Sequence, residues 1–340
     1  MIITFTANPS LDRTVDLGGP LVPGGVHRIG ADGLQPGGKG INVALGVHRA
    51  GLPVTAVLPA APQDALLELL EVEGLPHRAS PVAGRVRTNL TVLSAPETTT
   101  KLNEPGATLD RAEVAALEEL LLAVAGPGDS VMLSGSLAPG LPVDEYVRLV
   151  VALRERGARV GVDTSDAPLA ALAAALDSAA PDFLKPTAEE LGQILGADGA
   201  ALEAEAAAGR LDPVAEAALD LHRRGVGAVL VTLGGAGGLL ATEGAAWYSP
   251  SAPVEVVSTV GAGDSATAGY LIARALEEEP PLRLARSLAY GTAAVGLPGT
   301  TIPRPDQVRI DASRVVRLCP PAPSAPAGGI VRRRTRCPLR

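Results

Sequence analysis

The heptapeptide Ser258-Thr259-Val260-Gly261-Ala262-Gly263-Asp264 decides how this chain is organised. It predicts a turn that leaves an apolar strand and carries a carboxylate to the start of a helix. Gly261 and Gly263 let backbone N–H groups approach an anion closely, and the helix expected from Ser265 adds unpaired amides and the positive end of its dipole. A strand, a glycine turn and a helix in this order are typical of an α/β fold.

The same turn indicates a chemistry. Transfer of a γ-phosphoryl group to an alcohol requires charge stabilisation, alignment and a proton acceptor, and the turn offers all three. Two alternatives stay open. Asp264 could simply cap the helix of a packing turn. Gly261, Gly263 and Ala266 also match the dinucleotide-binding spacing G-x-G-x-x-A, although the acidic strand end expected about 20 residues later is replaced by a helix end and a break at residues 277–281.

Short apolar runs alternate with longer helical patterns over most of the chain. Strands are expected at residues 2–6, 54–58, 131–133, 160–163, 183–184 and 229–233. Helices are expected near residues 41–49, 65–73, 111–124, 143–156, 213–223, 265–275 and 282–295. Strands that are apolar throughout are typical of buried parallel sheets. The alternation predicts an α/β fold, a three-layer αβα doubly wound and mostly parallel sheet.

Polar or glycine-containing turns follow many of these strands. They are Ala7-Asn8-Pro9, Ser134-Gly135-Ser136, Asp163-Thr164-Ser165, Lys185-Pro186-Thr187 and Thr232-Leu233-Gly234-Gly235. In doubly wound sheets the ligand binds outside the carboxyl ends of the strands, so these turns are expected to surround the site.

Two segments break the alternation, at residues 14–35 and 85–101. Their turns and their strand-period alternation predict a small β-sheet that projects as a lid, with ordinary surface hairpins as the alternative. The main domain is expected to span residues 1–318. Residues 319–340 are rich in proline and arginine and predict a disordered tail.

Composition limits the classes of function. A chain of 340 residues with 46 % hydrophobic residues suits one large domain with an aliphatic core, because aromatic residues make up only 2 %. The net charge of −8 argues against nucleic acid or an anionic membrane as a partner. Cys319 and Cys337 both lie in the tail, and the four histidines show no ligand spacing. With no signal-peptide pattern and no long apolar run, a reducing cytoplasm is the expected location.

A second glycine loop lies early in the chain, at residues 33–42. Gly33, Gly38 and Lys39 have the spacing of a Walker A loop, but Gly40 replaces the hydroxyl residue that would hold Mg²⁺. The loop is better interpreted as an anchor for a sugar or its phosphate, with Lys39 as a point charge and Asn42 one turn inside the helix. A lysine in a solvated loop is the alternative.

Several motifs together resemble the ribokinase-like (PfkB) carbohydrate kinases, over about residues 2–308. Residues 37–44 and 258–264 resemble the two signature regions of that family, and the 1-phosphofructokinase and tagatose-6-phosphate kinase branch is most similar. Further matching motifs are Asn8-Pro9-Ser10-Leu11-Asp12, Lys101-Leu102-Asn103-Glu104-Pro105-Gly106, Ser134-Gly135-Ser136-Leu137-Ala138-Pro139-Gly140 and Leu297-Pro298-Gly299-Thr300.

The resemblance implies roles for particular residues, with ATP and Mg²⁺ as cofactors. Asp264 would be the catalytic base, beside an anion hole of Gly261, Ala262 and Gly263. The residues implied at the nucleotide are Lys185, Thr187, Thr232, Gly234, Gly237 and Gly263. The residues implied at the sugar phosphate are Asp12, Gly38, Lys39, Asn42, Arg87, Lys101, Asn103 and Ser136.

The chain departs from the family after Lys185. Members usually carry Asn-x-x-Glu there, a motif tied to Mg²⁺ and phosphate, whereas this chain has Thr187-Ala188-Glu189-Glu190. Glu190 keeps the acid, so an altered Mg²⁺ dependence is expected, with the metal held through water.

The resulting hypothesis is an ATP-dependent kinase of fructose 1-phosphate. Tagatose 6-phosphate and fructose 6-phosphate kinases are alternatives in the same family, a nucleoside or unphosphorylated-sugar kinase is a less favoured one, and a sugar-phosphate-binding regulator with little turnover is an alternative from another class. A projecting sheet has exposed edges, which predicts a homodimer formed through the lid.

Overall fold

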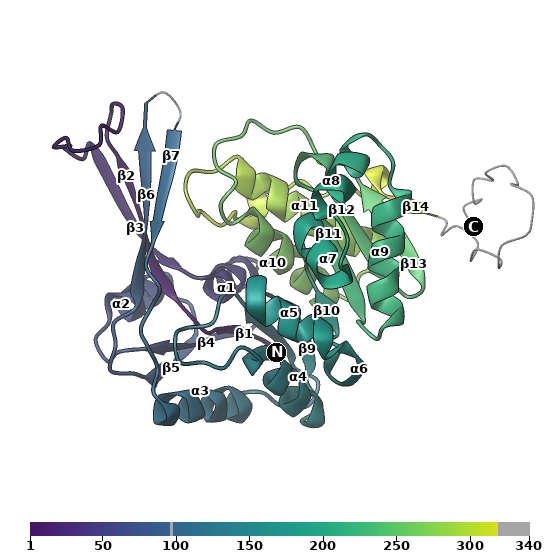
Figure 1. The fold of residues 1–340 in the computed structure, drawn as a ribbon, viewed down its shortest axis with the longest axis horizontal. Coiled ribbons are helices and arrows are strands. Elements are labelled where there is room, and N and C mark those ends of the chain that lie inside the picture. The colour runs from purple at the N-terminus through teal and green to yellow at the C-terminus, as the bar shows by residue number, and fades with distance from the viewer. Residues whose placement is uncertain (96–97, 319–340) are drawn as a thin grey trace, which may run out of the picture.

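The computed structural model describes residues 1–95 and 98–318. In that part of the chain, a ten-stranded sheet has the order β14-β13-β12-β11-β10-β9-β8-β1-β4-β5 (Figure 1). The strands are β1 (Ile2–Thr6), β4 (Val54–Ala60), β5 (His77–Pro81), β8 (Ser130–Ser134), β9 (Arg159–Asp163), β10 (Phe183–Leu184), β11 (Ala228–Thr232), β12 (Gly238–Thr242), β13 (Ala245–Ser249) and β14 (Val316–Leu318). The strands from β5 across to β11 pair in parallel, and β12 to β14 are antiparallel.

Helices cover both faces of this sheet. They are α1 (Lys39–Arg49), α2 (Ala65–Val72), α3 (Arg111–Val124), α4 (Glu145–Glu155), α5 (Asp166–Ala174), α6 (Leu176–Ala179), α7 (Ala188–Leu195), α8 (Gly199–Ala207), α9 (Asp212–Arg223), α10 (Ala262–Ala275) and α11 (Pro280–Val295), with 3₁₀ turns η1 (Gly234–Ala236), η2 (Pro305–Gln307) and η3 (Ala312–Arg314). Alternate residues of β1 enter different cores. Ile3 belongs to the core that includes buried residues of α3 to α9, and Ile2 to the core that includes buried residues of α1, α2, α10 and α11. The predicted three-layer αβα fold is confirmed.

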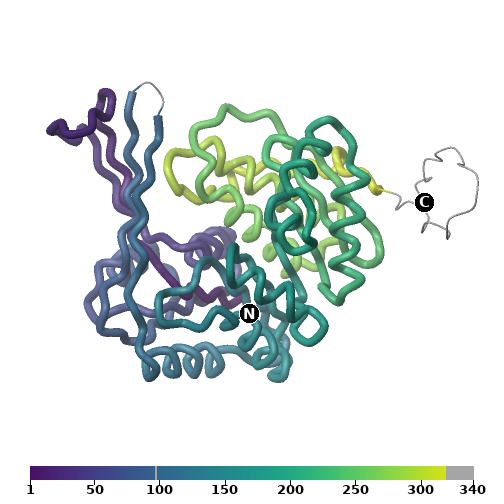
Figure 2. Tube along the Cα trace, in the orientation of Figure 1, coloured from purple at the N-terminus to yellow at the C-terminus, as the bar shows by residue number. Residues whose placement is uncertain are grey.

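A four-stranded sheet, here called the lid sheet, projects from the large one and is prominent in the tube view (Figure 2). Its order is β3-β2-β6-β7, with β2 (Ser10–Asp16), β3 (Ala31–Gly37), β6 (Arg87–Ser94) and β7 (Thr98–Asn103). The predicted small sheet is therefore present. Its strands reach beyond the predicted segments, because β2 begins at Ser10 and β7 ends at Asn103.

The segment before the glycine turn differs from the prediction. Residues 250–260 form no strand, so the apolar strand expected before Gly261 is wrong. Pro250 and Pro253 cannot donate ladder hydrogen bonds, and Val256 stays 67 % exposed. Helix α10 begins at Ala262 and not at Ser265, which places Asp264 inside its first turn.

The predicted disordered tail, residues 319–340, lies outside the described residues, and so do both cysteines. Within residues 1–95 and 98–318, none of the helices has the length and hydropathy that crossing a bilayer requires.

Candidate active site

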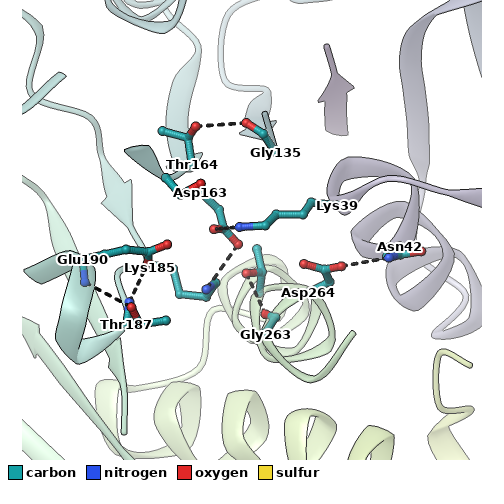
Figure 3. A network of polar contacts seen from close by, with 12 residues as sticks. Lys39, Asn42, Gly135, Asp163, Thr164, Lys185, Thr187, Glu190, Gly263 and Asp264 are labelled. Carbon is teal, nitrogen blue, oxygen red and sulfur yellow. Dashed lines mark hydrogen bonds and ion pairs between the residues drawn. The ribbon is translucent and has the colours of Figure 1, made fainter. Parts of the chain in front are cut away.

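Helix α10 carries Asp264 into the interior, beside the ends of the central strands (Figure 3). Gly261 precedes the helix with a φ of 79°, a left-handed conformation that glycine adopts without strain. The first amides of α10 have no acceptor within the helix. Asp264 is 8 % exposed, and its Oδ2 accepts a hydrogen bond of 2.8 Å from Nδ2 of Asn42 on α1. The predicted carboxylate and the predicted anion hole therefore lie in one helical turn.

The second glycine loop brings α1 to the same edge of the sheet. Gly38 precedes α1 with a φ of 110°, and a Cβ atom there would lie 2.7 Å from Cγ2 of Thr6. A Cβ atom on Gly37 would lie 2.4 Å from the carboxylate of Asp12. Asp12 in turn accepts a hydrogen bond of 3.0 Å from Nδ2 of Asn89. Only glycine permits these approaches, one between β3 and β2 of the lid sheet and one between the start of α1 and β1.

The carboxylate of Asp163 joins two of the predicted residues. Asp163 ends β9 and is 1 % exposed. Its Oδ1 lies 2.9 Å from Nζ of Lys39, and its Oδ2 lies 3.3 Å from Nζ of Lys185 (Figure 3). Sequence reasoning placed the Asp163 turn at this edge but did not name Asp163 as a site residue. The signal that could have found it is an acid that ends an otherwise apolar buried strand.

The lysines carry a second signal that sequence reasoning missed. The chain has 29 lysines and arginines together, but its only lysines are Lys39, Lys101 and Lys185. All three are residues that the resemblance implied at the site. An ammonium group is a compact, strongly hydrated point charge that suits phosphate, so its restriction to these positions is informative.

Burial and neighbouring charges set the protonation states. Burial, and after it the charge of Asp163, raises the pKa of Asp264 to about 6, while Lys39, the Asn42 hydrogen bond and Lys185 oppose the rise. Burial also acts to raise the pKa of Asp163, but the two ammonium groups outweigh it and hold that pKa below the ordinary value. The charge of Asp163 raises the pKa of Lys39. Asp264 is therefore ionised at neutral pH and more basic than an ordinary aspartate.

The lid sheet turns a polar face toward the large domain. Strand register places Asn89 and Asn103 opposite each other, with Lys101 one step further along the same face. Thr300, after α11, donates a hydrogen bond of 3.0 Å to Oε1 of Gln35 on that face. Lys101 and Asn103 are exposed on the edge strand β7. They lie on the lid and not against the buried carboxylate.

Arg87 and Ser136 meet where the lid sheet joins the large domain. Nη2 of Arg87 donates to Oγ of Ser136 over 3.4 Å and to the carbonyl of Asn8 over 3.2 Å. Nη1 donates to the carbonyl of Glu104 over 3.2 Å. Burial lowers the pKa of this guanidinium. The structure thus brings these two predicted residues together.

The residues predicted at the nucleotide lie at and after the end of β11. Thr232 ends that strand, and its N–H donates to the carbonyl of Pro186 over 3.1 Å. Gly234 begins η1 with a φ of 51°. Gly237 has a φ of 107°, and a Cβ atom there would lie 2.1 Å from the carbonyl oxygen of Ser249. Gly234 and Gly237 therefore permit a tight turn after β11, and neither places a side chain at the end of that strand.

Thr187 and Glu190 cap the start of α7 reciprocally. Oγ1 of Thr187 accepts from the Glu190 N–H over 3.1 Å, and Oε2 of Glu190 accepts from the Thr187 N–H over 2.8 Å. The charge of Glu190 contributes to the raised pKa of Lys39, so it acts on the site. Among the described residues, no group of three or more His, Cys, Asp or Glu side chains gathers as a metal cage. A single carboxylate beside phosphate oxygens and waters still fits Mg²⁺, which keeps most of its water.

Comparison with known proteins assigns the family. A family model described as a pfkB family carbohydrate kinase matches residues 6–307. The chain belongs to the pfkB family of carbohydrate kinases. Kinases of the pfkB family are phosphotransferases that use ATP and an alcohol acceptor. Membership replaces the dinucleotide-binding and Walker A interpretations of the two glycine turns.

Named pfkB relatives divide between two activities. The 1-phosphofructokinase of Rhodobacter capsulatus is 33 % identical and aligns over 94 % of this chain and 98 % of its own. The ATP-dependent 6-phosphofructokinase isozyme 2 of Mycobacterium tuberculosis is 34 % identical, over 90 % of this chain and 87 % of its own. The crystal structure of phosphofructokinase-2 from Escherichia coli, in complex with substrates and products, superimposes with a TM-score of 0.82 at 31 % identity, over 90 % of this chain and 96 % of its own.

Proposed function

We propose that this pfkB kinase is a 1-phosphofructokinase, which transfers the γ-phosphoryl group of MgATP to O6 of fructose 1-phosphate. The products would be fructose 1,6-bisphosphate and ADP. The observation that carries the proposal is the buried Asp264 in the N-terminal turn of α10. Its carboxylate accepts a hydrogen bond from Asn42 and faces Lys39 and Lys185. The 1-phosphofructokinase of Rhodobacter capsulatus, aligned over 94 % of the chain, supports fructose 1-phosphate as the acceptor.

Asp264 is the proposed general base. The 6-hydroxyl group gives its proton to the carboxylate as its oxygen bonds to the γ-phosphorus, and the bond from that phosphorus to the ADP oxygen breaks. The Asn42 hydrogen bond orients the carboxylate, and a pKa of about 6 leaves it ionised and ready to accept at neutral pH. After transfer, the proton leaves Asp264 to solvent.

Charge on the transferred group is stabilised by the start of α10 and by Lys185. The amides of Gly261, Ala262 and Gly263 have no helical acceptor and so donate to the phosphoryl oxygens. Nζ of Lys185 lies 3.4 Å from the position that a Cβ atom on Gly263 would occupy, so the ammonium is already at that helix start. Thr187, Thr232, Gly234 and Gly237 are the proposed border of the nucleotide.

The acceptor is held between α1 and the lid sheet. Asp12, Gly38, Lys39 and Asn42 are the proposed contacts of the sugar. The phosphate already on the sugar is assigned to Arg87, Ser136, Lys101 and Asn103. Because Lys101 and Asn103 are exposed on the lid while Arg87 and Ser136 lie at its base, we propose that the lid sheet closes over the dianion and excludes water.

Glu190 is the proposed residue for Mg²⁺, through water. When bound, the cation neutralises charge on the phosphate oxygens. One Glu190 oxygen already caps α7, so its other oxygen would serve the hydrated cation.

The outer face of the lid sheet supports the proposed homodimer. Register places Leu34, Arg13, Leu90 and Leu102 in one row across the four strands, opposite to the polar face. Leu34 is 46 % and Leu102 is 56 % exposed, an apolar surface that a second copy would cover. Light scattering at working concentration tests this, and a monomer there would rule the dimer out.

A substrate panel tests the activity. ADP release would be measured with MgATP and fructose 1-phosphate, fructose 6-phosphate, tagatose 6-phosphate, fructose or adenosine, with Asp264→Asn as control. Highest kcat/KM for fructose 1-phosphate is the expected result. A preference for fructose 6-phosphate would instead favour the second candidate, the activity named for the Mycobacterium tuberculosis relative. Binding of a sugar phosphate without turnover would favour the regulator.

A further inference from the structure

The backbone of Asp163 is fixed near the middle of the large sheet. Its carbonyl oxygen accepts a hydrogen bond of 2.8 Å from the Gly135 N–H. Oγ1 of Thr164 and the hydroxyl of Tyr146 both donate to the Gly135 carbonyl, over 2.9 Å and 3.0 Å. With Asp163 only 1 % exposed, its carboxylate cannot turn away to solvent.

Each oxygen of this carboxylate faces a different ammonium group. Oδ1 lies 2.9 Å from Nζ of Lys39, the first residue of α1, and Oδ2 lies 3.3 Å from Nζ of Lys185, which follows β10. A buried carboxylate is costly unless charged partners compensate its lost hydration, and these two lysines do so. The carboxylate thereby connects the start of α1 to the group that stands at the start of α10.

We infer that Asp163 is a positioning residue for the phosphoryl transfer, which holds Lys39 and Lys185 at a fixed separation on either side of one carboxylate. Lys39 is thereby kept toward the sugar and Lys185 toward the transferred group. The inference rests on the proposed function for the identity of these two ligands. Asp163 acts through the lysines and accepts no proton in the reaction.

Asp163 also sets the charge that the base experiences. Four groups face Asp264: Lys39 and Asn42 on α1, Asp163 at the end of β9, and Lys185 after β10. Asp163 raises the pKa of Asp264, whereas the other three lower it. When Asp163 is neutralised, its negative charge no longer offsets the positive charges of Lys39 and Lys185. The pKa of Asp264 should therefore fall, and Asp264 should become a weaker base.

A pH profile tests this role through activity. The substitution Asp163→Asn keeps the shape of the side chain and removes its negative charge. With MgATP and fructose 1-phosphate, we expect kcat to fall by roughly tenfold to a thousandfold. The acid limb of the kcat/KM profile should move to lower pH by about half a unit or more. Asp177→Asn, exposed on α6, removes the same charge and should change neither quantity. Lost activity with an unmoved acid limb would mean that Asp163 only supports the fold, and would overturn the inference.

Lysine labelling tests the same pairing without turnover and in the unmutated protein. The chain has three lysines, so acetic anhydride followed by peptide mass spectrometry resolves each one. The side chain of Lys39 is 37 % exposed, so the reagent can reach it. Because only the neutral amine reacts, and Asp163, followed by Asp264 and Glu190, raises the pKa of Lys39 against the effect of burial, that residue should label more slowly than Lys101 when each rate is normalised to the unfolded chain. In Asp163→Asn its rate should rise about tenfold for each unit by which its pKa falls.

The pH profile and the lysine labelling together separate this inference from the proposed function. Equal normalised labelling of Lys39 and Lys101 in the unmutated protein would overturn the pairing, even if Asp163→Asn does not fold. If the protein phosphorylates no sugar phosphate, the proposed function fails, while slow labelling of Lys39 that is lost in Asp163→Asn still supports the pairing of Lys39 with Asp163.

Discussion

Asn42 and Asp264 lie 222 residues apart in the chain and share a hydrogen bond of 2.8 Å. Asn42 lies in the first turns of α1 and Asp264 in the first turn of α10, and these two helices pack against each other. The bond is made to the ionised form of the carboxylate and so lowers its pKa against the effect of burial. One interhelical contact therefore links the glycine loop before α1 to the glycine turn before α10.

Asp264→Asn should remove the proposed base and keep the binding sites. We expect kcat for the sugar phosphate to fall by roughly 10² to 10⁴, with little change in KM. Steady-state kinetics with MgATP checks this. Turnover near the unmutated value would exclude Asp264 as the base.

The same variant should be more stable at neutral and alkaline pH. The pKa of Asp264 is about 6 in the folded protein and about 3.9 in the unfolded chain, so folding favours the protonated form. The stabilisation that Asp264 gives through its raised pKa is fully present below about pH 4 and is lost as the pH rises through 6. Asn cannot ionise, so we expect a gain of about 1–3 kcal/mol in the free energy of unfolding near pH 8, and little gain near pH 4. Denaturant titrations of both proteins at the two pH values decide the matter. A gain of equal size at both would argue against a buried charge as the cause.

Activity should depend on the titration of Asp264. For the unmutated protein, kcat/KM should fall as pH drops below about 6, because the protonated carboxyl group cannot accept the hydroxyl proton. Asn42→Ala removes a hydrogen bond that favours the charged form, so the acid limb should move to higher pH, opposite to the expectation for Asp163→Asn. An acid limb that stays in place in Asn42→Ala would show that the bond does not tune the base.

Lys101→Ala should weaken the grip on the acceptor. Lys101 lies on the polar face of the lid sheet, so KM for fructose 1-phosphate should rise at least about tenfold and KM for ATP much less. Arg13→Ala is the matched control, because Arg13 lies on the opposite face and pairs with the exposed Asp32. Equal rises in both KM values would refute the assignment of Lys101 to the sugar phosphate.

Glu190→Gln should alter the metal requirement. The amide keeps an oxygen for the Thr187 N–H and removes the charge proposed to attract hydrated Mg²⁺. We expect the Mg²⁺ concentration for half-maximal activity to rise several-fold, roughly threefold to thirtyfold. Thermal unfolding without metal serves as the control for the α7 cap. An unchanged Mg²⁺ dependence would remove Glu190 from the metal site.

Sequence patterns anticipated the fold in most of its helices and in the central strands. The expected helix at residues 111–124 coincides with α3, because Asp110 and Glu113 form a capping box at its start. The helices α5 to α8 were not anticipated. The stretches of α5 and α8 are rich in alanine and carry little amphipathic contrast, and α6 and α7 have only 4 and 8 residues. The antiparallel strands β12 to β14 were also missed. β12 and β13 have only 5 residues each, and β14 has 3 residues and pairs with β13, which lies far from it in the chain.

The sequence by itself determined the α/β class, the glycine turns and the residue types at the candidate site, since these depend on local backbone freedom and on side-chain chemistry. Only the tertiary structure decided that Lys39 and Lys185 share Asp163, and that Asn42 reaches Asp264. Charges on separate strands and helices acquire shifted pKa values only when packing removes water and brings them within a few ångströms of each other.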